Sequence, residues 1–174
     1  MSFFELLKTR RSIRKYSDQT IEPGKITRII EAALMSPASK RRNPWEFIVV
    51  QQKDILKQIA ESRPNGSQLL ANSPLGIVVI ADTHKSDVWI EDASIASIIM
   101  QLQAHDLGLG SCWIQVRNRN KTDEMSTEQY IKELLQIPEQ FSVLSVIAIG
   151  YPMEEKQAHS IDSCDINKVH YDKF

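Results

Sequence analysis

The sequence predicts a three-layer α/β/α sandwich, in which one sheet lies between two layers of helices. Two observations lead to this fold class. Four short apolar stretches typical of strands, at residues 45–50, 76–81, 111–116 and 143–149, are separated by segments with helical features. The second and fourth are apolar at nearly every position, which is typical of strands buried on both faces. Helices on both faces of the sheet would bury them, although the pattern leaves strand order and direction open.

The N-terminal elements follow from capping and proline signals. Ser2 is a candidate N-cap for a helix over residues 2–8. Residues 10–16 lack helical apolar spacing and are expected to run extended. A second helix follows Pro23 and ends at Pro37, because the residue before a proline avoids helical backbone angles.

The remaining helices are expected at residues 54–60, at 89–107 and after Ser126. The helix at 89–107 is small or apolar almost all round, so it should lie centrally. Gly108 and Gly110 are expected to cap its C-terminal end. Ser126 opens an S-x-x-Q capping box for a helix that reaches residue 135.

Composition excludes several classes of protein. The 174 residues suit a single domain over residues 1–174, and 42% hydrophobic with 25% charged residues excludes a disordered chain. A net charge of −1 offers no general attraction to nucleic acid or anionic membrane. The chain shows neither a signal-peptide pattern nor a membrane-spanning stretch, and Cys112 and Cys164 form no CxxC motif. We therefore expect a cytoplasmic protein without membrane or nucleic-acid partners.

The common catalytic motifs are absent. The sequence has no phosphate-binding P-loop, zinc-protease H-E-x-x-H or hydrolase G-x-S-x-G, and its four histidines have no metal-ligand spacing. No metal site is therefore expected. Cys112 precedes a predicted buried strand and is better explained as a small hydrophobic residue than as a nucleophile.

Two polar clusters are more informative. In the extended segment 10–16, Arg10, Ser12 and Arg14 share one side and would suit a phosphate. Compensation of the first helix's C-terminal dipole is an equally good explanation. The loop at residues 37–47 adds basic and hydrogen-bonding groups immediately before a strand. Together the clusters suggest a ligand with negative charge and an aromatic body.

At this point the chain resembles the FMN-dependent nitroreductase family in its short-chain form, over nearly its whole length. The likeness rests on several stretches in this order: RRSIRKY (10–16), SPAS (36–39), NPWEF (43–47), DLGLGSCWI (106–114), IGYP (149–152) and KVHY (168–171). Each is weak alone, but their order and spacing together are fairly specific.

The resemblance implies an α+β sandwich around a mixed, largely antiparallel sheet. It also implies a homodimer with FMN at the subunit interface and a C-terminal tail wrapped around the partner subunit. NAD(P)H would reduce the FMN, and a small acceptor would then oxidise it in a ping-pong cycle. The flavin itself carries the hydride, so no catalytic side chain is expected.

The resemblance also implies cofactor-binding positions. These are a first flavin-binding segment (Arg10, Arg11, Ser12, Arg14), a segment from the partner subunit (Pro37, Ala38, Ser39, Asn43), polar groups at the ring edge (Asn65, Gln68), a strand beside the ring (Trp113, Ile114, Gln115), and Gly150 with Lys156 near the phosphate. Ala38 stands where the family often has a hydroxyl, and Gln115 where it often has a small residue. The basic Lys40 and Arg41 predict an acceptor that bears a carboxylate.

The leading hypothesis is an oxidoreductase that uses NAD(P)H to reduce nitroaromatics, quinones or similar small acceptors. A flavoenzyme of the same scaffold with another reaction, such as reductive dehalogenation or dehydrogenation of a metabolite, shares every motif above. A flavin store or sensor without turnover is a third hypothesis. A nucleic-acid binder comes last, because no stacking aromatic residues accompany the basic loop.

Overall fold

The middle layer of the fold is a four-stranded sheet. The structure is a computed structural model that describes residues 2–174. The strands β1 (Trp45–Val50), β2 (Leu75–Asp82), β4 (Phe141–Gly150) and β3 (Gly110–Gln115) lie in the order β1-β2-β4-β3, and each neighbouring pair is antiparallel. The two strands predicted to be buried on both faces, β2 and β4, are the central ones. Each strand is within two residues of its predicted bounds.

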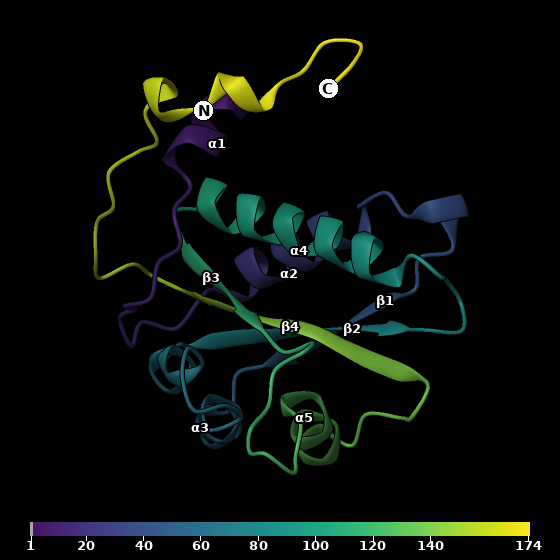
Figure 1. The fold of residues 1–174 in the computed structure, drawn as a ribbon. Coiled ribbons are helices and arrows are strands. Elements are labelled where there is room, and N and C mark those ends of the chain that lie inside the picture. The colour runs from purple at the N-terminus through teal and green to yellow at the C-terminus, as the bar shows by residue number, and fades with distance from the viewer. Residues whose placement is uncertain (1) are drawn as a thin grey trace.

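Helices cover both faces of this sheet (Figure 1). Helices α2 (Pro23–Leu34) and α4 (Trp89–Asp106) lie on one face, while α3 (Lys53–Ala60) and α5 (Thr127–Leu135) lie on the other. Successive residues of β2 point to opposite faces, so this one strand contributes to two separate core clusters. One cluster holds Ile77, Val79, Ile29, Ala96 and Met100, and the other holds Val78, Ile80, Leu56, Ile59 and Ile131. The predicted three-layer sandwich is therefore confirmed.

Both predicted serine caps are present. Ser2 Oγ accepts the Glu5 N–H at 3.2 Å and begins α1 (Phe3–Thr9). Ser126 Oγ accepts the Gln129 N–H at 3.0 Å and begins α5. Each bond satisfies one of the N–H groups that the first turn of a helix leaves unpaired.

The two glycines after α4 have different roles. Gly108 has the left-handed φ of 77°, and its N–H donates to the His105 carbonyl at 3.0 Å, so it terminates the helix as predicted. Gly110 does not cap the helix, because it is already the first residue of β3. Its missing side chain instead allows a close approach, since a Cβ there would lie 2.8 Å from the Cβ of Ile13.

The extended segment 10–16 packs along the outer edge of β3. The Ile13 N–H donates to the Ser111 carbonyl at 2.9 Å, and Ser12 and Ser111 form an isolated parallel bridge. This bridge is the parallel component of an otherwise antiparallel sheet. Tyr16 is buried, and its hydroxyl donates to the Ile13 and Ala148 carbonyls. The segment is therefore anchored at its middle and at its C-terminal end.

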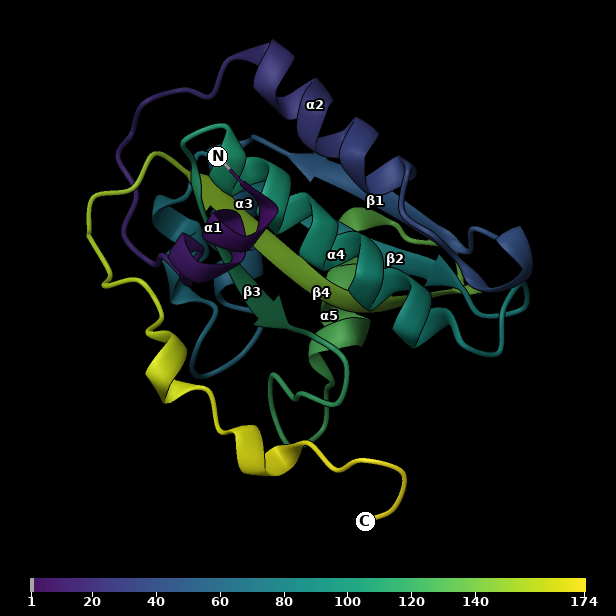
Figure 2. The ribbon, with the colours of Figure 1, turned by 90° about the horizontal axis from the view of Figure 1, so that it is seen from above.

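The C-terminal tail, residues 151–174, leaves β4 and passes α1 before it extends away from the body (Figure 2). The His159 N–H donates to the Lys8 carbonyl at 2.8 Å, and two short 3-10 helices follow, η3 (Ile161–Ser163) and η4 (Ile166–Lys168). From residue 155 onward the tail is exposed throughout. Among residues 2–174, no helix has the length and apolar content needed to cross a membrane.

Candidate functional site

A pocket of 260 Å³ lies at the outer edge of β3. Its lining includes four residues expected at the flavin site, Arg14, Trp113, Ile114 and Gln115, together with Arg63, Gly66, Leu69, Cys112 and Arg119. Strand β3 is the last strand of the sheet, so no further strand pairs with this edge. The pocket therefore combines cations, an aromatic side chain and the open edge of a strand.

Alternation along β3 shows which backbone groups reach the pocket. In an antiparallel ladder, the N–H and C=O of every second residue point to the same edge. The Ser111 carbonyl accepts the Ile13 N–H, and the Gln115 carbonyl accepts Arg63 Nη1 at 2.8 Å, so both lie on the outer edge. Trp113 lies between them and has the same orientation. Its carbonyl accepts a weak bond from Cys112 Sγ at 3.6 Å, so its N–H and the second lone pair of its carbonyl remain available to a ligand.

The side chains at the end of β3 are fixed by one another. Trp113 Nε1 donates to Gln115 Oε1 at 2.9 Å, and Gln115 Nε2 donates to the Arg117 carbonyl at 2.9 Å. The Gln115 amide is thus engaged through both its oxygen and its nitrogen. Burial raises the pKa of the Cys112 thiol, which keeps it protonated. The prediction that Cys112 is a buried, structural residue agrees with this environment.

Basic groups gather where segment 10–16 meets the tail. The Arg14 N–H donates to Glu154 Oε1 at 2.5 Å, and Lys156 Nζ lies 3.0 Å from Glu154 Oε2. These contacts lower the pKa of Glu154, the Arg14 N–H having the larger effect. The Arg14 side chain lines the pocket beside Cys112, whereas Arg10 and Lys156 lie outside the lining. Glu154 therefore joins Lys156 to the predicted phosphate-binding segment.

Arg11 and Gly150 lie close to this cluster but contribute differently. The Arg11 guanidinium donates to the Gln157 carbonyl, so it holds the tail and does not line the pocket. A Cβ on Gly150 would lie 2.9 Å from the Tyr16 Cβ, which shows that this glycine permits the close packing of residues 10–16. Both residues position the segment that carries Arg14.

The turn at residues 63–68 contains the two predicted ring-edge residues. Gln68 Oε1 accepts the Gly66 N–H at 2.8 Å, and Gln68 Nε2 donates to the Arg63 and Pro64 carbonyls. Its side chain therefore shapes the turn and is absent from the pocket lining. Asn65 is exposed in the same turn, beside Gly66, which does line the pocket.

Two pocket residues, Arg63 and Arg119, were not singled out from the sequence. Each lies in a connection between elements, Arg63 after α3 and Arg119 between β3 and α5. Isolated arginines in polar connections are usually solvated surface residues, so local sequence carries no signal for them. Only the packing of the two connections at the end of β3 brings them together.

The remaining predicted residues lie elsewhere in the chain. The loop at 37–43, with Pro37, Ala38, Ser39, Asn43 and the basic Lys40 and Arg41, is at the opposite end of the molecule from residues 10–16 (Figures 1 and 2). The Ser39 N–H donates to the buried Asp92 Oδ1 at 2.8 Å, which anchors the loop to α4. Lys40, Arg41 and Asn43 all have left-handed φ angles, of 52°, 56° and 43°. Within one chain, this loop does not reach the pocket.

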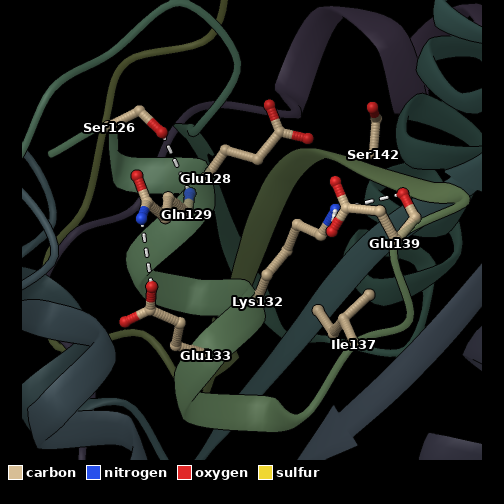
Figure 3. Close-up of a pocket in the computed structure, with 8 residues that line it drawn as sticks. All are labelled: Ser126, Glu128, Gln129, Lys132, Glu133, Ile137, Glu139 and Ser142. Carbon is tan, nitrogen blue, oxygen red and sulfur yellow. Dashed lines mark hydrogen bonds and ion pairs between the residues drawn. The ribbon is translucent and has the colours of Figure 1, made fainter.

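A larger hollow of 590 Å³ beside α5 contains none of the predicted site residues (Figure 3). Its charged groups are already paired. Lys132 Nζ lies 3.4 Å from Glu139 Oε2, and Glu128 Oε1 accepts the Val143 N–H at 2.9 Å. Because these groups are paired with one another, few charged groups remain in the hollow to bind a ligand. Across residues 2–174, no group of three or more His, Cys, Asp or Glu side chains is arranged to hold a metal ion.

Comparison with known proteins is consistent with the predicted resemblance. The model of the Nitroreductase family matches residues 7–63 and 61–151. The structure of an FMN-dependent nitroreductase from Clostridium difficile is 51% identical, with a TM-score of 0.97 over 99% of this chain and 100% of that one. A relative from Archaeoglobus fulgidus, which has the provisional name NADH dehydrogenase/NAD(P)H nitroreductase, is 37% identical over 98% of this chain and 97% of its own length. The FMN reductase [NAD(P)H] of Bacillus subtilis is 27% identical over 85% of this chain and 65% of that protein.

The family match covers most of the chain, including segment 10–16, β3 and the end of β4. The C. difficile structure shares the fold over essentially the full length. We conclude that the protein belongs to the nitroreductase family.

Proposed function

We propose that the protein is an FMN-dependent oxidoreductase that takes reducing equivalents from NAD(P)H and passes them to nitroaromatic, quinone or similar small acceptors. The observation that carries the proposal is the pocket on β3, where Arg14 meets Trp113, Ile114 and Gln115. The names of the C. difficile, A. fulgidus and B. subtilis relatives support the same activity. Because NAD(P)H is the donor, the proposal also places the protein in the cytoplasm.

The residues present fit FMN, which combines a dianionic phosphate with a flat ring that has a polar edge. Arg10 and Lys156 belong to the segments on either side of the bond between Arg14 and Glu154, and they supply cations that can bind phosphate oxygens next to the pocket. Leu69, Trp113 and Ile114 supply apolar surface for the ring. The N–H of Trp113 and the remaining lone pair of its carbonyl can pair with the ring's polar edge.

When bound, FMN would supply the redox chemistry, by accepting a hydride from NAD(P)H and returning electrons to the acceptor. The side chains of the pocket would bind and orient the FMN. Arg14 places a positive charge beside the pocket, which favours negative charge developing there. The bond between Trp113 and Gln115 fixes the strand surface, and Cys112 remains a neutral thiol that does not compete as a nucleophile. No side chain in the pocket is required to transfer a proton.

We further propose that two copies of the chain form a homodimer and that each pocket is completed by the 37–43 loop of the second copy. The position of this loop, opposite segment 10–16, supports the proposal. The tail supports it too, because Ile161, Ile166 and Tyr171 are 60%, 71% and 83% exposed in the single chain. Apolar side chains exposed in such a row indicate a surface that is covered by another molecule.

The activity is tested by the visible absorption of the purified protein under anaerobic conditions, before and after NADH or NADPH is added. We expect flavin bands that bleach with at least one donor and return when a nitroaromatic or quinone is supplied. Adding a halogenated phenol as a further acceptor tests the alternative reductive dehalogenation. A protein that remains colourless after incubation with FMN would overturn the proposal, and bands that neither donor bleaches would favour a store or sensor.

The shared site is tested by complementation between two variants that each damage one half. Arg14→Ala removes the cation from the pocket, and Asn43→Gly removes the amide of the 37–43 loop but tolerates its φ of 43°. If the halves come from different copies, equal mixing should restore about a quarter of wild-type activity, because about half of the dimers are mixed and each has one intact site. Each variant reassociated with itself is the control. Absence of recovery in proven mixed dimers would contradict the shared site.

The basic residues Lys40 and Arg41 remain a proposal for acceptor preference. Both are exposed, and the loop that carries them would lie over the second copy's pocket. Lys40→Ala and Arg41→Ala should each weaken activity toward a nitrobenzoate more than toward the neutral nitrobenzyl alcohol. Equal effects on both acceptors would remove this role.

A further inference from the structure

Arg63 and Arg119 form a pair of cations at the end of the pocket where β3 finishes. Both line the pocket, and the charge of Arg119 contributes, after burial, to lowering the pKa of Arg63. The pocket lining contains no carboxylate, and neither guanidinium has an ion pair within residues 2–174. Two neighbouring positive charges without an acidic partner are unfavourable unless an anion joins them.

The guanidinium of Arg63 is held from two sides. Its Nη1 donates to the Gln115 carbonyl at 2.8 Å, which fixes it to the end of β3. Its Nη2 lies 3.2 Å from the place that a Cβ on Gly66 would occupy, so the absent side chain leaves room for it. With one N–H engaged, the other donors of the planar guanidinium are available to a ligand.

Arg119 is positioned by its backbone. Its N–H donates to the Val116 carbonyl at 3.1 Å, and its carbonyl accepts the Thr127 N–H at 2.9 Å. Among residues 2–174, its side chain donates to the Asn118 carbonyl alone, through Nη1 at 2.8 Å. Most of its guanidinium donors are therefore free as well.

The two connections that carry the arginines are also bonded to each other. Thr127 Oγ1 donates to the Ser62 carbonyl at 3.1 Å, and Lys121 Nζ donates to the Glu61 carbonyl at 3.3 Å. Ser62 and Thr127 are both buried. The same packing that orders the connections thus brings the two cations together before any ligand arrives, which reduces the ordering cost of binding.

We propose that Arg63 and Arg119 form an anion subsite that binds a carboxylate or phosphate group of a substrate of the proposed reaction. The inference rests on the proposed function only in assigning the anion to a substrate. The subsite and segment 10–16 are anchored at different points of β3, because Arg63 bonds to Gln115 and Ile13 bonds to Ser111, four residues and about 14 Å apart along a strand that rises about 3.4 Å per residue. The anion could be the extra phosphate of NADPH or a carboxylate on the acceptor.

The test is Arg119→Gln, with Arg119→Lys to retain the charge and Arg117→Gln as the matched control. Arg117 is two residues away and does not line the pocket. KM and kcat are measured for NADPH against NADH, and for 4-nitrobenzoate against 4-nitrobenzyl alcohol. We expect KM for the more anionic member of one pair to rise about tenfold in R119Q, the loss of one charge-assisted hydrogen bond, while kcat and the other member change less than about twofold.

The outcomes separate the two sources of the anion. A selective change for NADPH assigns the subsite to the donor, and a selective change for 4-nitrobenzoate assigns it to the acceptor. Calorimetric titration with 4-nitrobenzoate and with 2′-phosphoadenosine reports binding without turnover, and R119Q should weaken one of them. Equal behaviour of R119Q and R117Q would overturn the subsite, as would a loss of FMN affinity in R119Q without a change in selectivity. Failure of the proposed function would instead appear in the wild-type protein, as absent or unbleached flavin bands.

Discussion

Gly110→Ala should damage both the stability of the fold and the proposed flavin site. A Cβ on Gly110 would lie 2.8 Å from both the Cβ and the Cγ2 of Ile13. Carbon atoms in contact prefer about 3.5–4.0 Å, so the two residues must separate by about 0.7 Å or more. Ile13 is branched at Cβ and buried in the core, so it has no rotamer that removes the contact.

The segment 10–16 must therefore move away from β3. Such overpacking costs about 1–3 kcal/mol, and losing the bond from the Ile13 N–H to the Ser111 carbonyl adds about 1 kcal/mol. We expect the free energy of unfolding in urea to fall by about 2–4 kcal/mol. Because Arg14 belongs to the displaced segment, the Kd for FMN, measured by quenching of flavin fluorescence, should rise about tenfold or more.

Gly108→Ala is the matched control, two residues earlier. Nothing lies within 4 Å of a Cβ at Gly108, but its φ of 77° is unfavourable for alanine. This variant should lose about 1 kcal/mol of stability and leave FMN affinity unchanged. If Gly110→Ala were no less stable than Gly108→Ala and bound FMN equally well, the close approach of residue 13 would not position the site.

Three further predictions concern individual side chains. Burial, with a smaller effect of the Arg10 charge, lowers the pKa of His105, so the unfolded chain binds the proton more readily and stability should fall as pH drops below about 6.5. Between pH 7.5 and pH 5.5, urea unfolding of His105→Gln should lose less stability than the wild type, and an equal loss would refute this origin. Cys112 should react with a disulfide reagent only when the protein unfolds, and its rapid reaction in the native protein would contradict its burial. Ser126→Ala should cost about 1 kcal/mol of unfolding free energy, and no change would show that the cap bond is not stabilising.

The layers and the central strands could be predicted because their signals are local. Nearly continuous apolar runs mark β2 and β4, and Ser2 and Ser126 mark helix starts through bonds to residues three positions away. Strand order could not be predicted, because it depends on pairing between distant stretches such as β2 with β4. The cap at Gly110 was predicted wrongly for the same reason, since its role is set by Ile13, about a hundred residues earlier in the chain.

The residues of the candidate site also fall into those that local sequence could predict and those that depend on tertiary packing. Arg14 and Trp113 belong to continuous motifs, and the structure brings them into one pocket. Gln68 lies outside these motifs and was expected at the ring edge from the resemblance alone, but its amide bonds to the backbone of its own turn. Arg63 and Arg119 have no motif, because their meeting depends on hydrogen bonds between two connections. The 37–43 loop cannot be assigned to the pocket within one chain, and its role there remains a prediction.

The position of the pocket follows from which backbone groups on the outer edge of β3 are paired and which are not. An edge strand presents unpaired N–H and C=O groups that would otherwise pair with another chain. On β3, segment 10–16 covers the start through Ser111, and Arg63 covers the end through Gln115. Between these two points, the N–H of Trp113 and one lone pair of its carbonyl stay open, with a group of cations on either side. A ligand with a flat polar edge and negatively charged ends would pair with this open part of the strand. For this reason we place the chemistry here and not in the larger hollow beside α5. The charged side chains in that hollow are already paired, Lys132 with Glu139 and Glu128 with the Val143 N–H.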